Sequence, residues 1–387
     1  MVYIERNLTK DFEKIKDIYP VISVVGPRQA GKTTFLKEKA KSFDTAYVLF
    51  DDPDARNLFE EDIKKFELQY VAGNEITILD EVQYCREAGH NLKYLADKGH
   101  KLWVTSELLL QKEVFSYLVG RVSILRLYPF SLQEFMAARK QKVYEASVGK
   151  RLIWEHLTYG GYPKVVLTEA VDVKKILLKD LYETMVLKDI AQNFGIQDIN
   201  SLENFARYLA FSVTGQLNFG EISRTSNISF QTTQKYLDAL EKSNVVVRVL
   251  PYYTNKIKEI TKQPKIYFMD NGIRNHIASS FWIEPDCPQF ENYVVTELVK
   301  AGFRVKYWRT KAGAEVDCVI EKDGKLVPVE VKLNSQKPSK SFYSFINSYK
   351  CGEGFIVYYS GDDKDLKLDK TKVKIRDFYG LLKDLAV

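Results

Sequence analysis

Residues 21–34 read VISVVGPRQAGKTT, an apolar run followed by a glycine-rich loop that matches G-x-x-x-x-G-K-[ST]. Continuous apolarity predicts a strand buried on both faces, and the residues after the loop follow a helical pattern. In this setting the glycines let backbone N–H groups wrap around a phosphate, and the positive end of the helix attracts its charge. Lys32 would reach the β- and γ-phosphates, and the Thr33 hydroxyl would hold Mg²⁺. We therefore expect an ATP site made by Gly26, Pro27, Arg28, Gln29, Ala30, Gly31, Lys32, Thr33 and Thr34.

Four more apolar runs follow in the first third of the chain, and helical patterns separate them. They lie at residues 46–50, 76–79, 101–104 and 122–125. Strands that alternate with helices in this way form a parallel sheet covered by helices. The predicted fold class of this region is therefore α/β.

Two acids, Asp80 and Glu81, directly follow the run at residues 76–79. Adjacent carboxylates at the end of a buried strand repel each other and lose hydration, so a cation is expected beside them. We predict that Asp80 binds the Mg²⁺ and that Glu81 polarises the attacking water. Ser106, just after the next run, is a candidate contact for the γ-phosphate. Arg121 is either an arginine finger that reaches a neighbouring subunit or an ordinary surface residue.

The composition is that of a folded protein without membrane-spanning segments. The 387 residues are 45% hydrophobic and 28% charged, with a net charge of +6, which argues against disorder and fits two to three domains. No apolar run approaches the roughly 20 residues of a transmembrane helix, and the start lacks a signal-peptide stretch. The cysteines form no metal-binding pair: Cys85, Cys287, Cys318 and Cys351. We expect a cytoplasmic protein with no membrane partner.

A set of motifs resembles the archaeal and bacterial AAA+ ATPases that carry a DUF4143-type C-terminal region. The motifs are the phosphate loop, residues 79–83, Gly120-Arg121 with residues 127–135, Gly160-Gly161-Tyr162-Pro163, and residues 236–240 and 264–273. The resemblance covers nearly the whole chain. It implies a P-loop AAA+ ATPase core at residues 1–140, a helical lid at 141–200, a winged helix at 201–264 and a PD-(D/E)XK nuclease-like α/β domain at 265–387.

The region of the implied winged helix concentrates positive charge. Between residues 224 and 265 there are eight Lys or Arg and three Asp or Glu, an excess of +5 in a chain whose total is +6. Ser229 has the chemistry of an N-cap for a helix over 231–243, and residues 245–253 would form the wing. The alternative is a protein-packing module whose cations are only solvated. Candidate DNA contacts are Gln231, Thr232, Gln234, Lys235, Lys256 and Lys258.

The last part of the chain places two carboxylates and a lysine on neighbouring strands. Residues 315–320 and 327–331 read as strands joined by a turn at 322–325. Asp317, then Glu330 with Lys332 two residues later, resembles the PD-(D/E)XK signature, in which the acids bind Mg²⁺ and the lysine orients water. Glu297, on the helix before these strands, would add a ligand, and Glu291 competes for that role. The alternative is an exposed hairpin with ordinary charges.

These features lead to two principal hypotheses. The first is an Mg²⁺-dependent ATPase that assembles as a homo-oligomeric ring, such as a hexamer, and couples ATP hydrolysis to movement on duplex or branched DNA. Its nuclease-like domain would cut DNA or only bind it. The second is a nucleotide-gated DNA- or protein-binding switch with a catalytically inactive nuclease-like domain. A third option is regulation through a protein partner without DNA, for which binding would be insensitive to salt.

Overall fold

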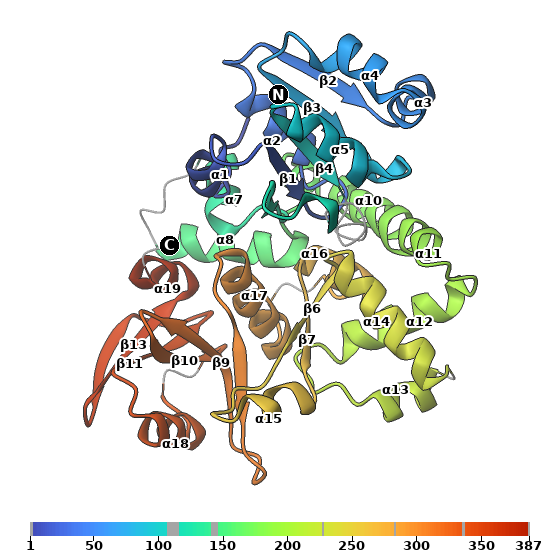
Figure 1. The fold of residues 1–387 in the computed structure, drawn as a ribbon. Helices are drawn as coiled ribbons and strands as arrows, with labels where there is room; N and C mark the ends of the chain where they lie inside the picture. Colours follow the sequence, from blue (N-terminus) through green and yellow to red (C-terminus); the bar gives the residue numbers. More distant parts are fainter. Residues whose placement is uncertain are drawn as a thin grey trace. The chain divides into compact units, whose positions relative to one another are not determined.

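The computed structural model describes residues 3–106, 116–140, 146–226, 228–281, 284–334 and 337–385 (Figure 1). The chain divides into two compact units. Unit 1 comprises residues 1–130 with 242–244, and unit 2 comprises residues 131–241 and 245–387. Among the described residues, no helix combines the length and the apolarity needed to cross a bilayer.

Unit 1 is built on a five-stranded sheet in the order β2-β3-β4-β1-β5, with every pairing parallel. Each strand begins and ends within one or two residues of an apolar run in the sequence, and β1 is buried along its whole length. This confirms the predicted α/β fold. The strands are β1 (Val21–Val25), β2 (Thr45–Leu49), β3 (Ile76–Asp80), β4 (Leu102–Ser106) and β5 (Val122–Arg126).

Helices cover this sheet and bury aromatic side chains against it. One cluster places the ring of Phe12 edge-on to Phe35 and to Trp103, at centroid distances of 5.3 and 4.9 Å. A second cluster contains Phe50 and Phe59, whose rings lie 4.8 Å apart. The helices are α1 (Thr9–Ile15), α2 (Lys32–Lys39), α3 (Pro53–Glu61), α4 (Ile63–Phe66) and α5 (Ala88–Asp97), with short π and 3₁₀ turns at Glu67–Val71, Val82–Tyr84 and Ser116–Leu118.

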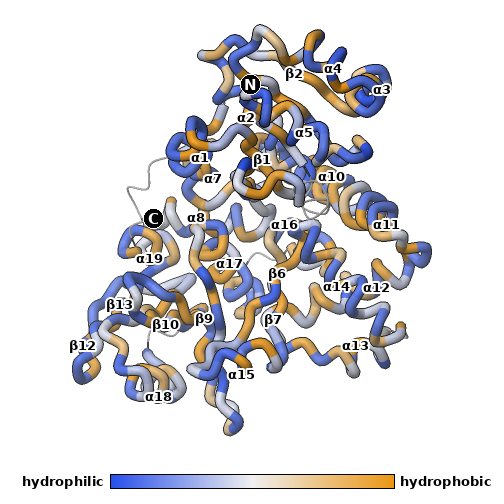
Figure 2. The backbone as a smooth tube through the Cα atoms, in the orientation of Figure 1, coloured by the Kyte–Doolittle hydropathy of each residue, from blue (hydrophilic) through white to orange (hydrophobic). Residues whose placement is uncertain are grey.

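Unit 2 begins with a helical part. In Figure 2 the tubes of α10 and α14 change between hydrophobic and hydrophilic colours along their length, as expected for helices that bury one face. The helices are α7 (Leu132–Ala138), α8 (Ala146–Tyr159), α9 (Pro163–Val166), α10 (Val171–Leu181), the π-helix Tyr182–Asp189, α11 (Ile190–Asn193), α12 (Ile199–Phe211), α13 (Phe219–Ser226) and α14 (Phe230–Lys242).

The predicted wing differs from the observed structure. Strand β6 (Val246–Val249) does not turn back at residue 253 but pairs antiparallel with β7 (Lys265–Phe268), and α15 (Lys256–Thr261) lies in the connection. The predicted domain boundary at 264/265 therefore falls between two paired strands. The sequence pattern could not show that β6 pairs with β7, because tertiary packing, and not closeness in the sequence, determines which strands pair.

Two of the glycine-containing motifs interlock within unit 2. Gly160 has a φ of +75°, and a Cβ on it would lie 2.1 Å from the Asp270 carboxylate. That carboxylate accepts hydrogen bonds from the backbone N–H groups of Gly161 (2.7 Å) and Ile273 (3.1 Å). It thereby joins the end of α8 to the start of α16 (Asn271–Ile277). The contact between the two segments therefore explains why position 160 is a glycine and position 270 an aspartate.

The C-terminal part of unit 2 contains a six-stranded mixed sheet in the order β12-β13-β11-β10-β9-β8. Strands β9 and β10 form the predicted hairpin, and both turn residues, Asp323 and Gly324, have positive φ as a tight hairpin turn requires. The strands are β8 (Lys306–Arg309), β9 (Glu315–Lys322), β10 (Lys325–Lys332), β11 (Glu353–Tyr358), β12 (Lys364–Leu368) and β13 (Thr371–Asp377), and the helices are α17 (Cys287–Lys300), α18 (Lys340–Tyr349) and α19 (Phe378–Leu385).

Candidate functional site

The glycine-rich loop lies between β1 and α2, as predicted. Gly26 lies so close to the segment after β5 that a Cβ on it would be 2.0 Å from the carbonyl oxygen of Leu127. Gly31 has a φ of +98°. Only glycine meets both requirements. The Lys32 ammonium donates to the carbonyl oxygens of Gly26 (3.0 Å) and Pro27 (3.3 Å), which holds it within the loop. The loop therefore presents a cation together with the first backbone N–H groups of a helix.

The Asp80 carboxylate, at the end of β3, is buried and lies beside this loop. It accepts hydrogen bonds from the hydroxyls of Thr33 (2.9 Å to each oxygen), Tyr47 (2.7 Å) and Thr105 (2.5 Å). The donors come from α2, β2 and β4, so the strand order converges them on one carboxylate. Burial and then the bond to Asp80 raise the pKa of the Tyr47 hydroxyl above its ordinary value.

This donor set fits Mg²⁺. The Thr33 hydroxyl and the Asp80 carboxylate, both hard oxygen ligands, contact each other although they are 47 residues apart in the chain. Mg²⁺ characteristically takes one or two such protein ligands and completes its shell with water and phosphate oxygens. Tyr47 was not predicted, because a single hydroxyl within an apolar strand gives no signal until the order of the strands is known.

Glu81 has an unusual backbone conformation. It lies in the left-handed region at φ 61° and ψ 45°, which costs a residue with a side chain about 1–3 kcal/mol. Its N–H donates to the Thr105 hydroxyl (2.9 Å), and its carboxylate accepts from the Gln83 amide. Thr105 therefore links the two adjacent acids. Ser106, the predicted phosphate contact, is fully buried and ends β4, and the next residue, Glu107, lies outside the described residues.

Arg121 lies at the edge of the sheet opposite the phosphate loop. Val122 pairs in register with Val21, so Arg121 is level with the start of β1, whereas the loop follows its end. Five residues of strand separate the two edges by about 16 Å. The Arg121 guanidinium is half-exposed and donates to Asp97 (2.5 Å). It is therefore remote from the phosphate loop of its own chain.

A second arginine, Arg6, contacts the phosphate loop and was missed by the sequence analysis. Its guanidinium is 5% exposed and donates to the carbonyl oxygens of Ala30 (2.9 Å) and Tyr128 (2.6 Å), and it lies 4.8 Å from the centre of the Phe130 ring. It therefore ties the loop to the segment after β5. No motif marks this residue, because it precedes the loop by 20 residues in an otherwise ordinary polar stretch.

The outer face of α14 carries the residues predicted to contact DNA. Ser229 caps this helix through a hydrogen bond from the Thr232 N–H (3.0 Å), as predicted. Three of the candidates are exposed on the helix: Gln231, Gln234 and Lys235. The Thr232 hydroxyl is partly used, since it bonds the Ser229 hydroxyl, and Lys235 also donates to the carbonyl oxygen of Gly195 (3.2 Å).

Part of the positive charge of this region is paired within the fold. Arg248 forms ion pairs with Asp238 and Glu241, and Lys256 lies 3.3 Å from Glu259. Lys265 is buried in ion pairs of its own. The excess of +5 already subtracts the acids that pair with Arg248 and Lys256, so only Lys265, whose partners lie outside residues 224–265, lowers it further. Lys258, on α15, is exposed.

The C-terminal carboxylates lie close together, as the signature predicts. Glu330 and Lys332 share one face of β10 and form an ion pair of 3.0 Å. Asp317, on β9, accepts a hydrogen bond from the Val331 N–H (2.8 Å). Burial raises the pKa of the Asp317 carboxyl to about 7, with Glu291 as the next contributor.

A buried lysine ammonium lies among these acids. Lys265, 3% exposed, contacts Glu291 (3.1 Å) and Glu315 (2.5 Å), and the Tyr267 hydroxyl donates to Glu291 (2.8 Å). Burial acts to lower the pKa of Lys265, but Glu291, Glu315 and then Asp317 raise it above its ordinary value. The Lys265 ammonium thus already neutralises part of the cluster, and the described residues include no group of three or more His, Cys, Asp or Glu that could hold a metal ion. The cluster does not fit a resident Mg²⁺.

Glu297, the predicted additional metal ligand, forms its contacts elsewhere, with α7 and with Lys300. Its carboxylate is 2% exposed, accepts from the Leu132 N–H (2.7 Å) at the start of α7 and pairs with Lys300 (2.7 Å). Glu291 contacts Lys265 instead. The two acids lie on the same helix, and the sequence offered no means to tell which of them faces the strands.

Comparison with known proteins supports the coarse assignment. Residues 19–136 match the family model of an AAA domain, residues 150–282 match the domain of unknown function DUF8612, and residues 288–377 match the domain of unknown function DUF4143. The AAA ATPase domain and the DUF4143-type region predicted from the motifs are confirmed.

Two relatives share less than 30% identity with this chain. An uncharacterized protein of Haemophilus influenzae is 29% identical over 58% of this chain and 56% of its own length. One of Methanocaldococcus jannaschii is 24% identical over 94% of this chain and 81% of its own length. The chain thus spans little more than half of the Haemophilus protein. A solved Walker-type ATPase of Pyrococcus abyssi has 14% identity and a TM-score of 0.45, covering 71% of this chain and 96% of that one.

Proposed function

We propose that the chain binds ATP with Mg²⁺ at the phosphate loop and hydrolyses it. The observation that carries this proposal is the contact of the Thr33 hydroxyl with both oxygens of Asp80 at 2.9 Å, directly beside the glycine-rich loop. A phosphate-binding helix end and two Mg²⁺ ligands converge there on one point. The match of residues 19–136 to an AAA domain supports the same reading.

Each residue of this site would have a distinct role. The loop amides and Lys32 bind the β- and γ-phosphates, and Thr33 with Asp80 holds the Mg²⁺, which neutralises the phosphate charge that develops during transfer. Glu81 orients and polarises the attacking water. The Thr105 hydroxyl, bonded to Asp80 and to the Glu81 N–H, fixes the relative positions of the two acids.

The test is phosphate release measured together with ATP binding by calorimetry. Lys32→Ala should abolish binding, whereas Glu81→Gln should retain binding and reduce turnover about 10²- to 10⁴-fold, the usual contribution of a general base. Lys41→Ala removes a cation just beyond the same helix that is 68% exposed, and serves as the control. A Glu81→Gln variant with normal turnover would exclude the proposed role of Glu81.

We propose further that Arg121 completes the ATP site of a neighbouring copy in a homo-oligomeric ring. Its distance from the loop of its own chain and its half-exposed guanidinium support this role. Lys32→Ala and Arg121→Ala should each be inactive alone. Mixed, they should regain part of the activity, because some interfaces then combine an intact loop with an intact arginine. Equal inactivity of the mixture would refute the role in trans.

We propose that ATP hydrolysis acts on DNA and that unit 2 contacts this DNA. The helices α12 to α14 followed by the β6–β7 pair are compatible with a winged helix, and the exposed face of α14 offers Gln231, Gln234 and Lys235. Each cation that contacts a phosphate contributes about one to the slope of log affinity against log salt. Lys258→Ala should reduce this slope more than Lys256→Ala, because Glu259 already neutralises Lys256.

A second candidate is the nucleotide-gated switch, and the Lys265 ammonium among the C-terminal acids favours it. A nuclease-like domain in which Lys265 pairs with Glu291 and Glu315, and Lys332 with Glu330, would bind DNA or a protein without cutting it. Steady-state turnover separates the candidates. A motor should be stimulated by DNA, whereas a switch should retain nucleotide with little stimulation. Cleavage of labelled DNA that disappears in Lys332→Ala would contradict the non-cutting reading in either case.

A further inference from the structure

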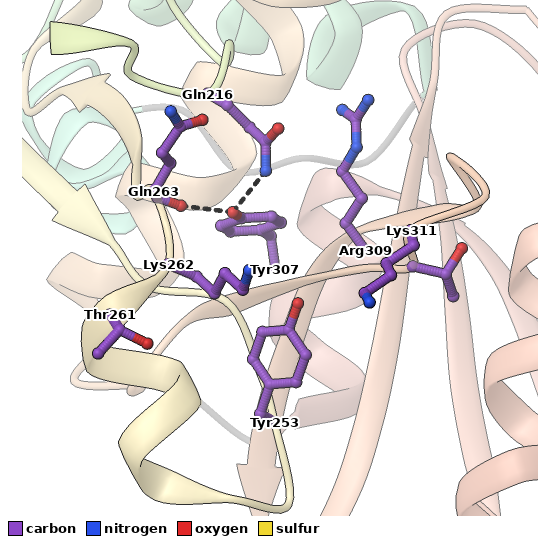
Figure 3. Close-up of a pocket in the computed structure, with 9 residues that line it drawn as sticks. Gln216, Tyr253, Thr261, Lys262, Gln263, Tyr307, Arg309 and Lys311 are labelled. Carbon is purple, nitrogen blue, oxygen red and sulfur yellow. Dashed lines mark hydrogen bonds between the residues drawn. The ribbon is translucent and has the colours of Figure 1, made fainter.

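A hollow of about 350 Å³ opens on the surface of unit 2, and none of its lining residues belongs to the proposed ATP site. Three segments far apart in the chain form it: the stretch after α12, the connection between β6 and β7, and the end of β8 with its following turn. Figure 3 shows the side chains that line it, among them Gln216, Tyr253, Lys262, Tyr307, Arg309 and Lys311.

Part-buried hydrogen bonds hold the lining of the hollow in place. Tyr307 is 1% exposed, and its hydroxyl donates to the carbonyl oxygen of Gln263 (2.6 Å) and accepts from the Gln216 amide (2.8 Å), as Figure 3 shows. The backbone of Tyr253 is also held in place, because its N–H donates to the buried Glu259 carboxylate (3.1 Å). The shape therefore exists before any ligand binds, which lowers the entropic cost of binding.

The charge of the lining is one-sided. Lys262, Arg309 and Lys311 all border the hollow, and none of its described lining residues is acidic. Arg309 is partly neutralised by Glu315, which lies 2.8 Å away, but Lys262 and Lys311 form no ion pair within the described part of the chain. Like charges that converge on one concave site repel each other unless an anion lies between them. The lining therefore favours an anionic ligand.

The remaining side chains narrow the chemistry of that ligand. Tyrosine rings offer a face on which a nucleobase can stack, and the glutamine and threonine side chains offer hydrogen-bonding groups for its edge. The volume lies at the lower end of the roughly 300–1,000 Å³ of small-ligand pockets, so there is room for about one nucleotide. We propose that this hollow binds a single nucleotide unit, with its phosphate on Lys262, Lys311 and Arg309 and its base against Tyr253.

Two sources can supply this chemistry: a free mononucleotide, or a nucleotide within a DNA strand. In the second case the site extends the proposed DNA contact and rests on that part of the proposed function. The hollow and the phosphate loop share no residue, so a negative result for nucleotide binding in the hollow would not affect the proposed ATP site. In particular, ATP turnover measured without DNA should not change when the lysines of the hollow are replaced.

The test uses the full chain carrying Lys32→Ala, which removes nucleotide binding at the phosphate loop. Binding of dAMP and of deoxyadenosine is followed by calorimetry. Binding of a fluorescein-labelled single strand of about ten deoxythymidines is followed by anisotropy. The double variant Lys262→Gln/Lys311→Gln is compared with Lys364→Gln/Lys370→Gln, which removes the same charge from exposed positions of the same unit.

We expect the Lys262/Lys311 variant to lose at least about tenfold in affinity, the usual effect of losing hydrogen bonds to a charged group, and the control pair to lose less than about twofold. Tyr253→Leu should lose about fivefold or more, since a stacked base is lost. Saturable binding of dAMP but not of deoxyadenosine identifies a free nucleotide as sufficient, and binding of the strand alone identifies DNA as the source. Equal losses for the two lysine pairs, or unchanged binding in Lys262→Gln/Lys311→Gln, would overturn the proposal.

Discussion

Replacing Lys265 by methionine should strongly destabilise unit 2. The ammonium is 3% exposed and contacts Glu291 at 3.1 Å and Glu315 at 2.5 Å. Methionine retains most of the side chain's apolar length but leaves the carboxylates without their cation. Removing one partner of a buried ion pair costs about 3–5 kcal/mol, because the remaining charge has lost its hydration. Such a loss is a large fraction of the about 5–15 kcal/mol that stabilises a typical domain.

The assay is urea-induced unfolding followed by tryptophan fluorescence, with Trp308 buried in the C-terminal sheet as the local reporter. Lys258→Met, an exposed position on α15, is the matched control and should change the free energy of unfolding by less than about 0.5 kcal/mol. The double variant Lys265→Met/Glu291→Gln should recover much of the loss, since it removes an unpaired charge. A loss below about 1 kcal/mol in Lys265→Met would refute the account of a buried, charge-compensated cluster.

The same variant tests why the cluster does not take a metal. In Lys265→Met, Glu291 and Glu315 lose their contact with the ammonium, so millimolar Mn²⁺ bound by these acids should raise the stability of this variant by mass action. A Lys32→Ala chain with Lys265 intact should show no such increase, because the ammonium already contacts Glu291 and Glu315. Equal stabilisation of both chains by Mn²⁺ would show that the acids bind metal despite Lys265.

Three further perturbations follow from the geometry. Gly160→Ala should lower the free energy of unfolding by more than about 1 kcal/mol in a urea titration, because its φ is positive and its Cβ would lie 2.1 Å from Asp270. The pKa of Asp317 is raised to about 7, so the folded chain keeps a proton that the unfolded chain releases near its usual pKa of about 4. Stability should therefore fall as pH rises from about 4 to about 7, and Asp317→Asn should flatten this slope in unfolding curves. Arg6→Ala should weaken ATP binding in calorimetry, because the Ala30 carbonyl loses its buried hydrogen-bond donor and the phosphate loop is held less firmly. Unchanged affinity would limit Arg6 to a role in stability.

The phosphate loop and the strands around it were predictable because their signals are local. An uninterrupted apolar run such as Val21–Val25 indicates a strand wherever it occurs. The glycines at 26 and 31 are required by the backbone path of the loop itself. The same holds for the hairpin of β9 and β10, whose turn residues and alternating pattern specify its register.

The contacts that give the sites their chemistry were decided by the tertiary structure. Tyr47 and Thr105 reach Asp80 only because β2 and β4 flank β3 in the sheet. Lys265 meets Glu291 because β7 packs beside α17, whereas Glu297 on the same helix turns to α7. In each case the two residues are distant in sequence, and they come into contact only because the helices and strands that carry them pack with their apolar faces buried. The chain alone therefore identified the glycine-rich loop between β1 and α2, and packing determined which charges lie beside one another.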